Sequence, residues 1–468
     1  MTTGTVVGGG PNGLAAAITL ARAGVETTLL EAGDTVGGGL RSFEAIVPGL
    51  VHDHCAAIHP MAVGSPFLAT IDIEKRGLRW RSAEIECVHP LDDGTAGVLQ
   101  RTVADTAAGM GPDGAAWRAL FQRPVEGFEK IGPAMMGPLL RVPRHPLALA
   151  GFGAPTPLPA AALARAFRTP QARGLWGGVA AHTFRPLHEP MSSAIGKGLL
   201  TAGHRHGWQV AEGGSGAIAA ALLAEFEDLG GRVQTGVRVT AADVPTTDVT
   251  LFDLDPHQVA RILGDRLPAR VRRAFTRFRR GPGAFKVDFA VQGGVPWTNA
   301  HARRSSTVHL GGEFAEVAAT ERAIAAGTMP DRPFVLVGQQ YLADPTRSVG
   351  DVHPVWSYAH VPHGYTGDAT EAIIAQIERF APGFRDRIVG TAVCSTTEMS
   401  RYNANYVGGD INTGSKDPLQ LVFGPRITVQ PYDLGVAGMY ICSAATPPGP
   451  GAHGMCGHHA ATRALARL

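Results

Sequence analysis

The sequence has few cysteines, little net charge and no long hydrophobic run, and each shortage excludes a class of protein. Its 468 residues carry a formal net charge of +2, which gives no indication of a nucleic-acid partner. No apolar run approaches the roughly 20 residues that span a bilayer. The cysteines are odd in number, scattered and without a Cys-x-x-Cys pair: Cys55, Cys87, Cys394, Cys442 and Cys456. We therefore expect no disulfide framework, zinc site or dithiol redox centre.

A glycine-rich turn near the N-terminus carries the strongest signal. The β-branched strand around Thr5–Val7 runs into Gly-x-Gly-x-x-Gly, whose glycines are Gly8, Gly10 and Gly13. The first glycine permits a tight turn, the second lets the backbone approach a pyrophosphate, and the third lets the following helix pack on the strand. That helix, predicted over 14–23, offers its N-terminus to phosphates. The pattern predicts dinucleotide binding, and the alternative is a glycine-rich turn without a function.

Glu31 ends the second predicted strand, about 20 residues after the turn, where an acid binds the hydroxyls of an adenosine ribose. Its carboxylate would repel a 2′-phosphate, so we expect FAD or NAD rather than NADP. Because this fold begins within a few residues of Met1, no room is left for a leader peptide, and the cytoplasm is the expected compartment.

A second glycine cluster favours FAD over NAD. Gly37-Gly38-Gly39-Leu40-Arg41-Ser42 begins six residues after the acid, whereas NAD enzymes continue into another βα unit at this point. A flexible loop is the alternative. Further along, a glycine-rich turn at 213–216 leads into a helix predicted over 217–229, and a turn plus strand is predicted over 230–239. A buried strand predicted over 438–443 runs into a loop rich in glycine and proline, 447–457, and a closing helix.

On these residues the chain resembles FAD-dependent oxidoreductases of the phytoene-desaturase and carotenoid-isomerase group, within the amine-oxidoreductase superfamily. More narrowly, it resembles the branch named after pyridine nucleotide-disulfide oxidoreductase domain-containing protein 2. The resemblance covers nearly the whole chain. Besides the fingerprint and its Gly-Gly-x-x-Arg-Ser extension, it rests on the segments 48–54, 59–60, 207–216, 283–288 and 447–457. One departure is Gln209, where relatives tend to have proline.

The resemblance implies an α/β fold: a discontinuous Rossmann FAD domain of the glutathione-reductase type, plus an α+β substrate domain. The expected FAD-binding domain comprises 1–60, 205–265 and 430–468, and the substrate domain comprises 61–204 and 266–429. A redox dithiol and a second full Gly-x-Gly-x-x-Gly are both missing from the sequence, so reduction by a bound NADPH is not expected.

The resemblance also implies a set of FAD contacts. The N-terminal glycines take the pyrophosphate, Glu31 the ribose, a valine backbone the adenine, and the C-terminal loop the isoalloxazine. The full expected set is Gly8, Gly10, Pro11, Asn12, Gly13, Glu31, Ala32, Gly38, Gly39, Leu40, Arg41, Val237, Val239, Ala445, Gly451, His453, Gly454 and Met455.

An enzyme of this type passes a hydride from a substrate C–H to flavin N5, and the protein supplies orientation and a dry pocket. The candidate catalytic residues are His52, Asp53, His453 and Tyr402. For each, the alternative is a hydrogen bond to backbone or FAD. Adjacent residues on a strand point to opposite faces, so His52-Asp53-His54 does not form a metal site, and we expect no metal. The polar segment 400–410 and the group Trp356, His360, His363 and Tyr365 are further candidates for the pocket wall.

Two segments bear on partners. The apolar, proline-rich run 130–158 is expected to be ordinary core and loop, with a substrate tunnel or membrane contact as alternatives. Arg270–Arg280 contains six arginines at the spacing of an amphipathic helix with a solvated basic face, and contact with an anionic membrane or an acidic partner is the alternative. The oligomeric state is left open.

The sequence therefore predicts an FAD-dependent oxidoreductase that desaturates or oxidises a moderately apolar small molecule, with the flavin reoxidised by oxygen or a quinone-type acceptor. One rival is a double-bond isomerase that uses the flavin without net turnover. The other is a non-catalytic, escort-type binding protein on the same fold.

Overall fold

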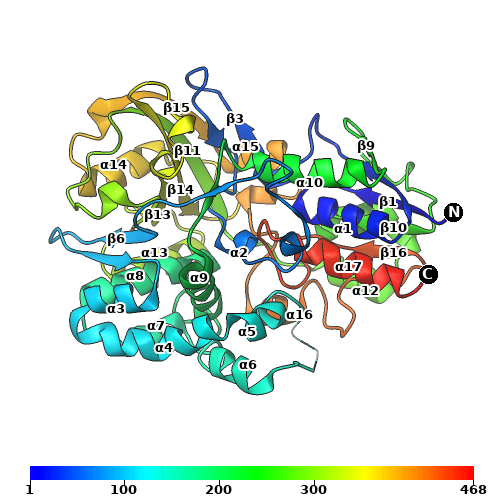
Figure 1. The fold of residues 1–468 in the computed structure, drawn as a ribbon, viewed down its shortest axis with the longest axis horizontal. Helices are drawn as coiled ribbons and strands as arrows, with labels where there is room; N and C mark the ends of the chain where they lie inside the picture. The colour runs from blue at the N-terminus through cyan, green and yellow to red at the C-terminus, as the bar shows by residue number, and fades with distance from the viewer. Residues whose placement is uncertain (139, 141) are drawn as a thin grey trace.

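A computed structural model describes residues 1–138, 140 and 142–468, and its elements are arranged around two large sheets (Figure 1). The first sheet is parallel, with strand order β16-β10-β1-β2-β9. Its strands come from three distant parts of the chain: β1 (Thr3–Val7) and β2 (Glu26–Leu30), β9 (Arg232–Gln234) and β10 (Val249–Phe252), and β16 (Met439–Ile441).

Helices cover both faces of this sheet because its strands alternate two apolar sets of side chains. One set, which includes Val6, Leu29 and Leu251, is buried with α1 (Pro11–Arg22), α10 (Gly216–Asp228) and α17 (Met455–Leu465). The other set, with Val7 and Phe252, is buried with α11 (Pro256–Leu263) and α12 (Ala269–Thr276). Figure 1 shows α1, α10 and α17 together on one face, near both termini.

The second sheet has the order β15-β11-β14-β13-β12-β6-β7, and only its β6–β12 pair is parallel. One face packs on α14 (Thr370–Phe380) through side chains such as Phe285 and Val337. The strands are β6 (Cys87–Pro90), β7 (Ala96–Leu99), β11 (Gly283–Gln292), β12 (Thr307–Leu310), β13 (Val335–Gly338), β14 (Val352–Val361) and β15 (Ile388–Cys394).

A helical layer packs on the other face of the second sheet, with Trp117 and Trp176 fully buried in its core. The layer consists of α3 (Val103–Gly109), α4 (Gly114–Glu126), α5 (Phe128–Met135), α6 (Pro146–Gly153), α7 (Ala160–Ala164), α8 (Pro170–Ala180), α9 (Ser193–His206) and α13 (Phe314–Ala325). Short elements complete the fold: α2 (Pro60–Val63), α15 (Thr396–Tyr402), α16 (Pro418–Phe423), and the strand pairs β3 (Ser42–Phe43) with β4 (His52–Asp53) and β5 (Trp80–Arg81) with β8 (Val210–Ala211).

The predicted fold class is confirmed: a parallel Rossmann-type sheet stands beside a further sheet domain. The strand predicted over 230–239 is shorter than expected, because the chain leaves the sheet after β9 and continues to the cavity described below. β10 was not expected at all. The domain boundaries stay a prediction, as does the cytoplasmic location. In the part of the chain that is described, no helix combines the length and apolarity needed to cross a membrane.

Candidate functional site

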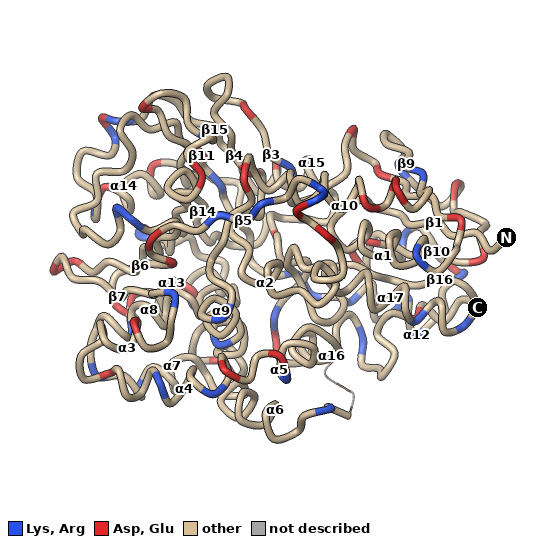
Figure 2. The backbone as a smooth tube through the Cα atoms, in the orientation of Figure 1, with Lys and Arg blue, Asp and Glu red and all other residues tan. Residues whose placement is uncertain are grey.

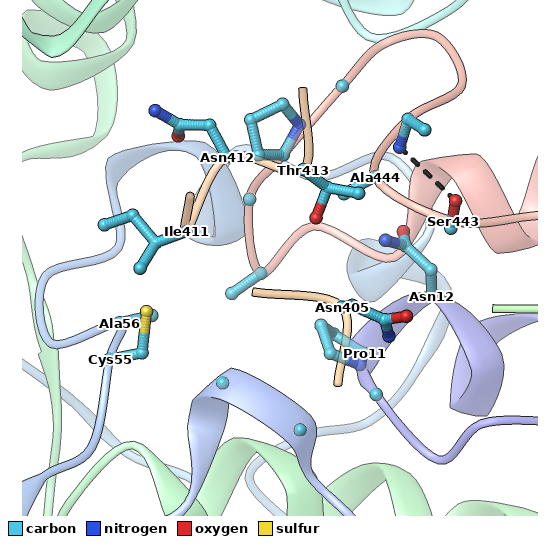
Figure 3. Close-up of a pocket in the computed structure, with 18 of the residues that line it drawn as sticks. Pro11, Asn12, Cys55, Ala56, Asn405, Ile411, Asn412, Thr413, Ser443 and Ala444 are labelled. Carbon is cyan, nitrogen blue, oxygen red and sulfur yellow. Dashed lines mark hydrogen bonds between the residues drawn. The ribbon is translucent and has the colours of Figure 1, made fainter. Parts of the chain in front are cut away.

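A cavity of about 910 Å³ extends from the carboxyl ends of the parallel strands to the second sheet. This volume lies at the upper end of the range of about 300–1,000 Å³ that is usual for small-molecule sites. Ligands of open α/β sheets bind at the carboxyl ends of the strands. Figure 3 draws part of the lining, with Asn12, Asn405 and Ser443 toward one side of the opening and Cys55 and Ile411 toward the other.

The N-terminal glycine turn forms the floor of this cavity. Gly8 has a φ of +102°, and a Cβ there would lie 2.8 Å from the carbonyl oxygen of Asp253, so a side chain is excluded both by conformation and by space. A Cβ on Gly38 would lie 3.1 Å from the Cα of Gly10. The two glycine clusters therefore meet, and they present bare backbone to the cavity together. The first turn of α1 begins at this point without a side-chain cap.

Glu31 is held at the edge of the cavity by backbone donors. Its Oε2 accepts the N–H of Gly9 at 2.7 Å, and its Oε1 accepts the N–H of Gly33 at 2.7 Å. The guanidinium of Arg41 lies 3.3 Å from Oε1. The carboxylate thus faces the cavity in a fixed orientation, as a ribose-binding acid requires.

Sequence reasoning missed Asp253, which follows β10 and lines the cavity beside the glycine turn. Its Oδ2 accepts the N–H of Gly13 at 2.9 Å and lies 2.7 Å from the position of a Cβ on Gly10. Burial, aided by the nearby Glu31 carboxylate, raises the pKa of Asp253 to about 7. The available signal was an acid at the carboxyl end of a buried strand, but β10 itself was not predicted.

The C-terminal loop closes the cavity from the opposite side and runs from Ser443 to His453. His453 is buried, and its Nδ1 accepts the N–H of Met455 at 3.1 Å. Burial lowers the pKa of His453 to about 4, so this imidazole is neutral near pH 7. Cys456 is buried behind the loop, and its Sγ lies 3.2 Å from the carbonyl oxygen of Gly449.

The far end of the cavity is largely apolar. Leu336, Trp356 and Tyr358 reach it from the second sheet, together with Thr307. Facing them are side chains from α9 and the segments before and after it: His182, Met191, Ile195, Leu199 and Trp208. Of the sequence candidates for this wall, Trp356 lines the cavity. His360 instead pairs with Glu321, at 2.6 Å in the core, and His363 and Tyr365 lie outside the lining.

Two catalytic candidates lie outside the cavity lining. Asp53 is buried and pairs with Arg347 at 2.6 Å. Burial acts to raise the pKa of Asp53, but Arg347 and the hydrogen bonds around it outweigh this and hold the pKa below its usual value. His52 is also buried, with its Nδ1 3.5 Å from Asp288. Their catalytic roles stay predictions, and their burial and charged partners favour structural roles behind the cavity lining.

Tyr402 does line the cavity, but its hydroxyl donates to the carbonyl oxygen of Gly38. Burial raises the pKa of this phenol. Asn405, from the same segment, accepts the N–H of Asp255 through Oδ1 at 2.8 Å. The polar segment 400–410 therefore joins the residues after β10 to the second glycine cluster, and part of it lines the cavity wall as expected.

Most of the predicted FAD contacts share this one cavity, although they come from four separate parts of the chain. Gly13, Gly454 and Met455 do not line it: Gly13 packs against Gly8 beneath the turn, and Gly454 packs against Ala15 and Phe67 at the start of α17. The predicted FAD contacts that line the cavity are Gly8, Gly10, Pro11, Asn12, Glu31, Ala32, Gly38, Gly39, Leu40, Arg41, Val237, Val239, Ala445, Gly451 and His453.

Comparison with known proteins agrees with this geometry. Residues 6–68 match the family described as "NAD(P)-binding Rossmann-like domain". Over 97% of its length the chain is 22% identical to "Pyridine nucleotide-disulfide oxidoreductase domain-containing protein 2" of Mus musculus, covering 92% of that protein.

Solved structures extend the comparison. A triple mutant of putrescine oxidase matches with a TM-score of 0.62 at 18% identity, covering 100% of this chain and 99% of that one. A putative protoporphyrinogen oxidase from Exiguobacterium sp. 255-15 matches with a TM-score of 0.55 at 14% identity, covering 100% and 98%. The chain therefore has a nucleotide-binding oxidoreductase fold with structural neighbours in the amine oxidase and protoporphyrinogen oxidase group. The expected resemblance to pyridine nucleotide-disulfide oxidoreductase domain-containing protein 2 and to the amine oxidase group is confirmed, whereas a phytoene-desaturase-like activity stays a prediction.

Proposed function

We propose that this protein is an FAD-dependent oxidoreductase that takes a hydride from a C–H bond of a moderately apolar small molecule. The observation that carries the proposal is the single cavity, which joins a dinucleotide cradle at Gly10 and Glu31 to an apolar chamber at Leu336 and Trp356. A cofactor bound in the cradle and a substrate bound in the chamber would meet in one enclosed space. Loss of the hydride desaturates or oxidises the substrate, and oxygen or a quinone-type molecule then reoxidises the flavin.

The residues present fit FAD. Two bare glycine clusters and the uncapped start of α1 suit a pyrophosphate. At this helix start the Oδ1 of Asn12 is buried, lines the cavity and has no hydrogen-bond partner among the described residues. Glu31 suits ribose hydroxyls and disfavours a 2′-phosphate. When bound, FAD supplies the hydride acceptor, N5 of its isoalloxazine.

The chain's own residues bind and orient the cofactor and the substrate, and they exclude water from the cavity. Tyr402 fixes the carbonyl of Gly38, and the Ser443–His453 loop covers the cavity from the other side. The chamber walls contributed by the second sheet and α9 carry no Asp, Glu, Lys or Arg among the described lining residues. An apolar chamber favours an uncharged substrate, because burying an unpaired charge there is costly.

The first test is the visible absorption spectrum of the purified protein, repeated on the supernatant after heat denaturation. If the two visible absorption bands of flavin are found in the supernatant after denaturation, the FAD is bound non-covalently. Bleaching of these bands by an apolar substrate under nitrogen supports net oxidation. Activity that appears only after the flavin has been reduced supports the isomerase instead. A colourless protein that takes up no added FAD would overturn the proposal in favour of an escort-type binding protein.

A further inference from the structure

Exposed aliphatic side chains gather around α16 and the loop after it. Leu419 is 52% exposed, and Ile427 and Val429 are 71% and 67% exposed. Arg426 holds this loop closed by donating hydrogen bonds to the carbonyl oxygens of Gln430 and Asp433. Ile427 and Val429 therefore project from a braced loop, where exposed aliphatic side chains have no stabilising role in the fold.

A basic helix lies beside this loop. α12 carries Arg270 and Arg273, and Arg277 follows its last residue; all three are exposed and border a shallow surface depression. No ion pair within residues 1–138, 140 and 142–468 involves any of the three. Figure 2 shows the basic positions on α12.

Two contacts place the basic helix and the apolar loop next to each other. Just after α12, the N–H of Arg279 donates to Oε1 of Gln420 on α16 at 2.7 Å. Further along the loop, a Cβ on Gly435 would lie 2.9 Å from the Cγ of Pro268, the residue directly before α12. The basic helix and the apolar loop therefore lie side by side.

This surface adjoins the cavity. Gln420 and Leu421 line the cavity from α16, Gly424 lines it from the residue after this helix, and Leu149 and Phe152 line it from α6. Leu149, Gln420 and Leu421 are only partly buried, and the adjacent Leu419 is exposed, so this part of the cavity wall lies near the protein surface. Within the run 130–158, Val142 and Leu147 are almost fully exposed, and Leu139 and Arg141 lie outside the described residues.

We propose that the surface formed by Leu419, Ile427, Val429, Arg270, Arg273 and Arg277 docks on an anionic bilayer, with the aliphatic side chains entering the headgroup region. Unpaired arginines select negative headgroups, and exposed aliphatic side chains beside them gain by leaving water. A soluble acidic partner would need only the charges. An apolar substrate dissolved in the bilayer would then reach the cavity without crossing water.

The test is co-sedimentation of the full-length protein with sucrose-loaded vesicles of phosphatidylcholine alone or mixed with one quarter phosphatidylglycerol. We expect binding to the mixed vesicles that is at least tenfold tighter and that weakens from 50 to 500 mM salt. The double variant Ile427→Asp/Val429→Asp and the triple variant Arg270→Gln/Arg273→Gln/Arg277→Gln should each lose at least tenfold. Each arginine near an anionic surface contributes roughly fivefold.

A matched control is Val389→Asp/Val393→Asp, which alters two exposed valines on β15 of the second sheet and should bind like the unmodified chain. Thermal melting confirms that each variant folds. Equal binding by the Ile427/Val429 variant, equal loss in the control, or no preference for anionic vesicles would overturn the proposal. If only the arginine variant loses binding, the attraction to the vesicles is electrostatic alone and the aliphatic side chains do not enter the headgroup region, which also overturns the proposal. None of these outcomes depends on whether the protein binds FAD.

Discussion

Asp253 accepts a hydrogen bond from the backbone N–H of Gly13 through Oδ2, at 2.9 Å, across 240 residues of sequence. This contact joins the end of β10 to the start of α1 directly beneath the phosphate cradle. It also puts a buried carboxyl group where a bound pyrophosphate would add negative charge. Proton binding at Asp253 is therefore linked to the stability of the cradle.

The first prediction concerns pH. The pKa of Asp253 is raised from its usual 3.8 to about 7, so between these values the folded state binds more protons than the unfolded state. The free energy of unfolding then falls as pH rises from about 4 to about 7, by up to about 1.4 kcal/mol per pH unit from this group.

Urea denaturation at several pH values checks this, comparing the protein with Asp253→Asn, which cannot titrate. The difference in the free energy of unfolding between the two should change steadily across this window and level off above it. Asp113→Asn serves as the control: hydrogen bonds from Arg168 and Thr169 hold the pKa of Asp113 low against its burial, so its contribution has the opposite sign. A constant difference for Asp253→Asn would contradict the prediction.

The second prediction concerns cofactor affinity. Replacing Glu31 by Gln removes the charged acceptor at the edge of the cavity and should weaken FAD binding roughly 10- to 100-fold, the range for hydrogen bonds to a charged group. Quenching of flavin fluorescence measures the dissociation constant. Glu26→Gln alters an exposed acid that pairs with Arg232 at the start of β2, the strand that Glu31 follows, and it should leave the affinity unchanged. Similar effects of the two substitutions would argue against a ribose contact at Glu31.

The third prediction separates structure from catalysis at Asp53. Its carboxylate pairs with Arg347 in the core, and removing one partner of a buried pair costs about 3–5 kcal/mol. Asp53→Asn should therefore lower the free energy of unfolding by about this amount. Once a substrate is known, the folded fraction of this variant should reduce its flavin at a nearly normal rate. A normal stability with flavin reduction slowed 100-fold or more would restore Asp53 as a catalytic residue.

The fourth prediction tests the glycine turn by comparing two glycines with positive φ. A Cβ on Gly8 would meet the backbone of Asp253 at 2.8 Å, whereas one on Gly24, at φ +82°, has open space. Gly24→Ala should cost only the conformational penalty, about 1 kcal/mol. Gly8→Ala should cost more and also abolish FAD binding, as thermal melting and FAD titration together would show. Equal melting temperatures and intact FAD binding in both variants would contradict the steric argument.

The sequence by itself determined the nucleotide-binding half of this protein. The turn from Gly8 to Gly13 and the acid at Glu31 form a local pattern, because strand, turn and helix follow one another within about 30 residues. Spacing alone predicted β1, α1 and β2, the three elements that carry this turn and this acid. The closing loop that contains His453 was also identified from its glycines and prolines.

Only the tertiary structure decided which distant residues share the cavity. Asp253 reaches the glycine turn because β10 pairs with β1, a partnership between segments more than 240 residues apart that no local pattern encodes. Asp53 looked catalytic beside two histidines, yet the fold brings Arg347 to it from 294 residues away and buries the pair in the core. Sequence patterns record periodicity and backbone freedom, which are local. Charge pairing and access to a cavity depend on contacts that exist only after the two sheets have packed.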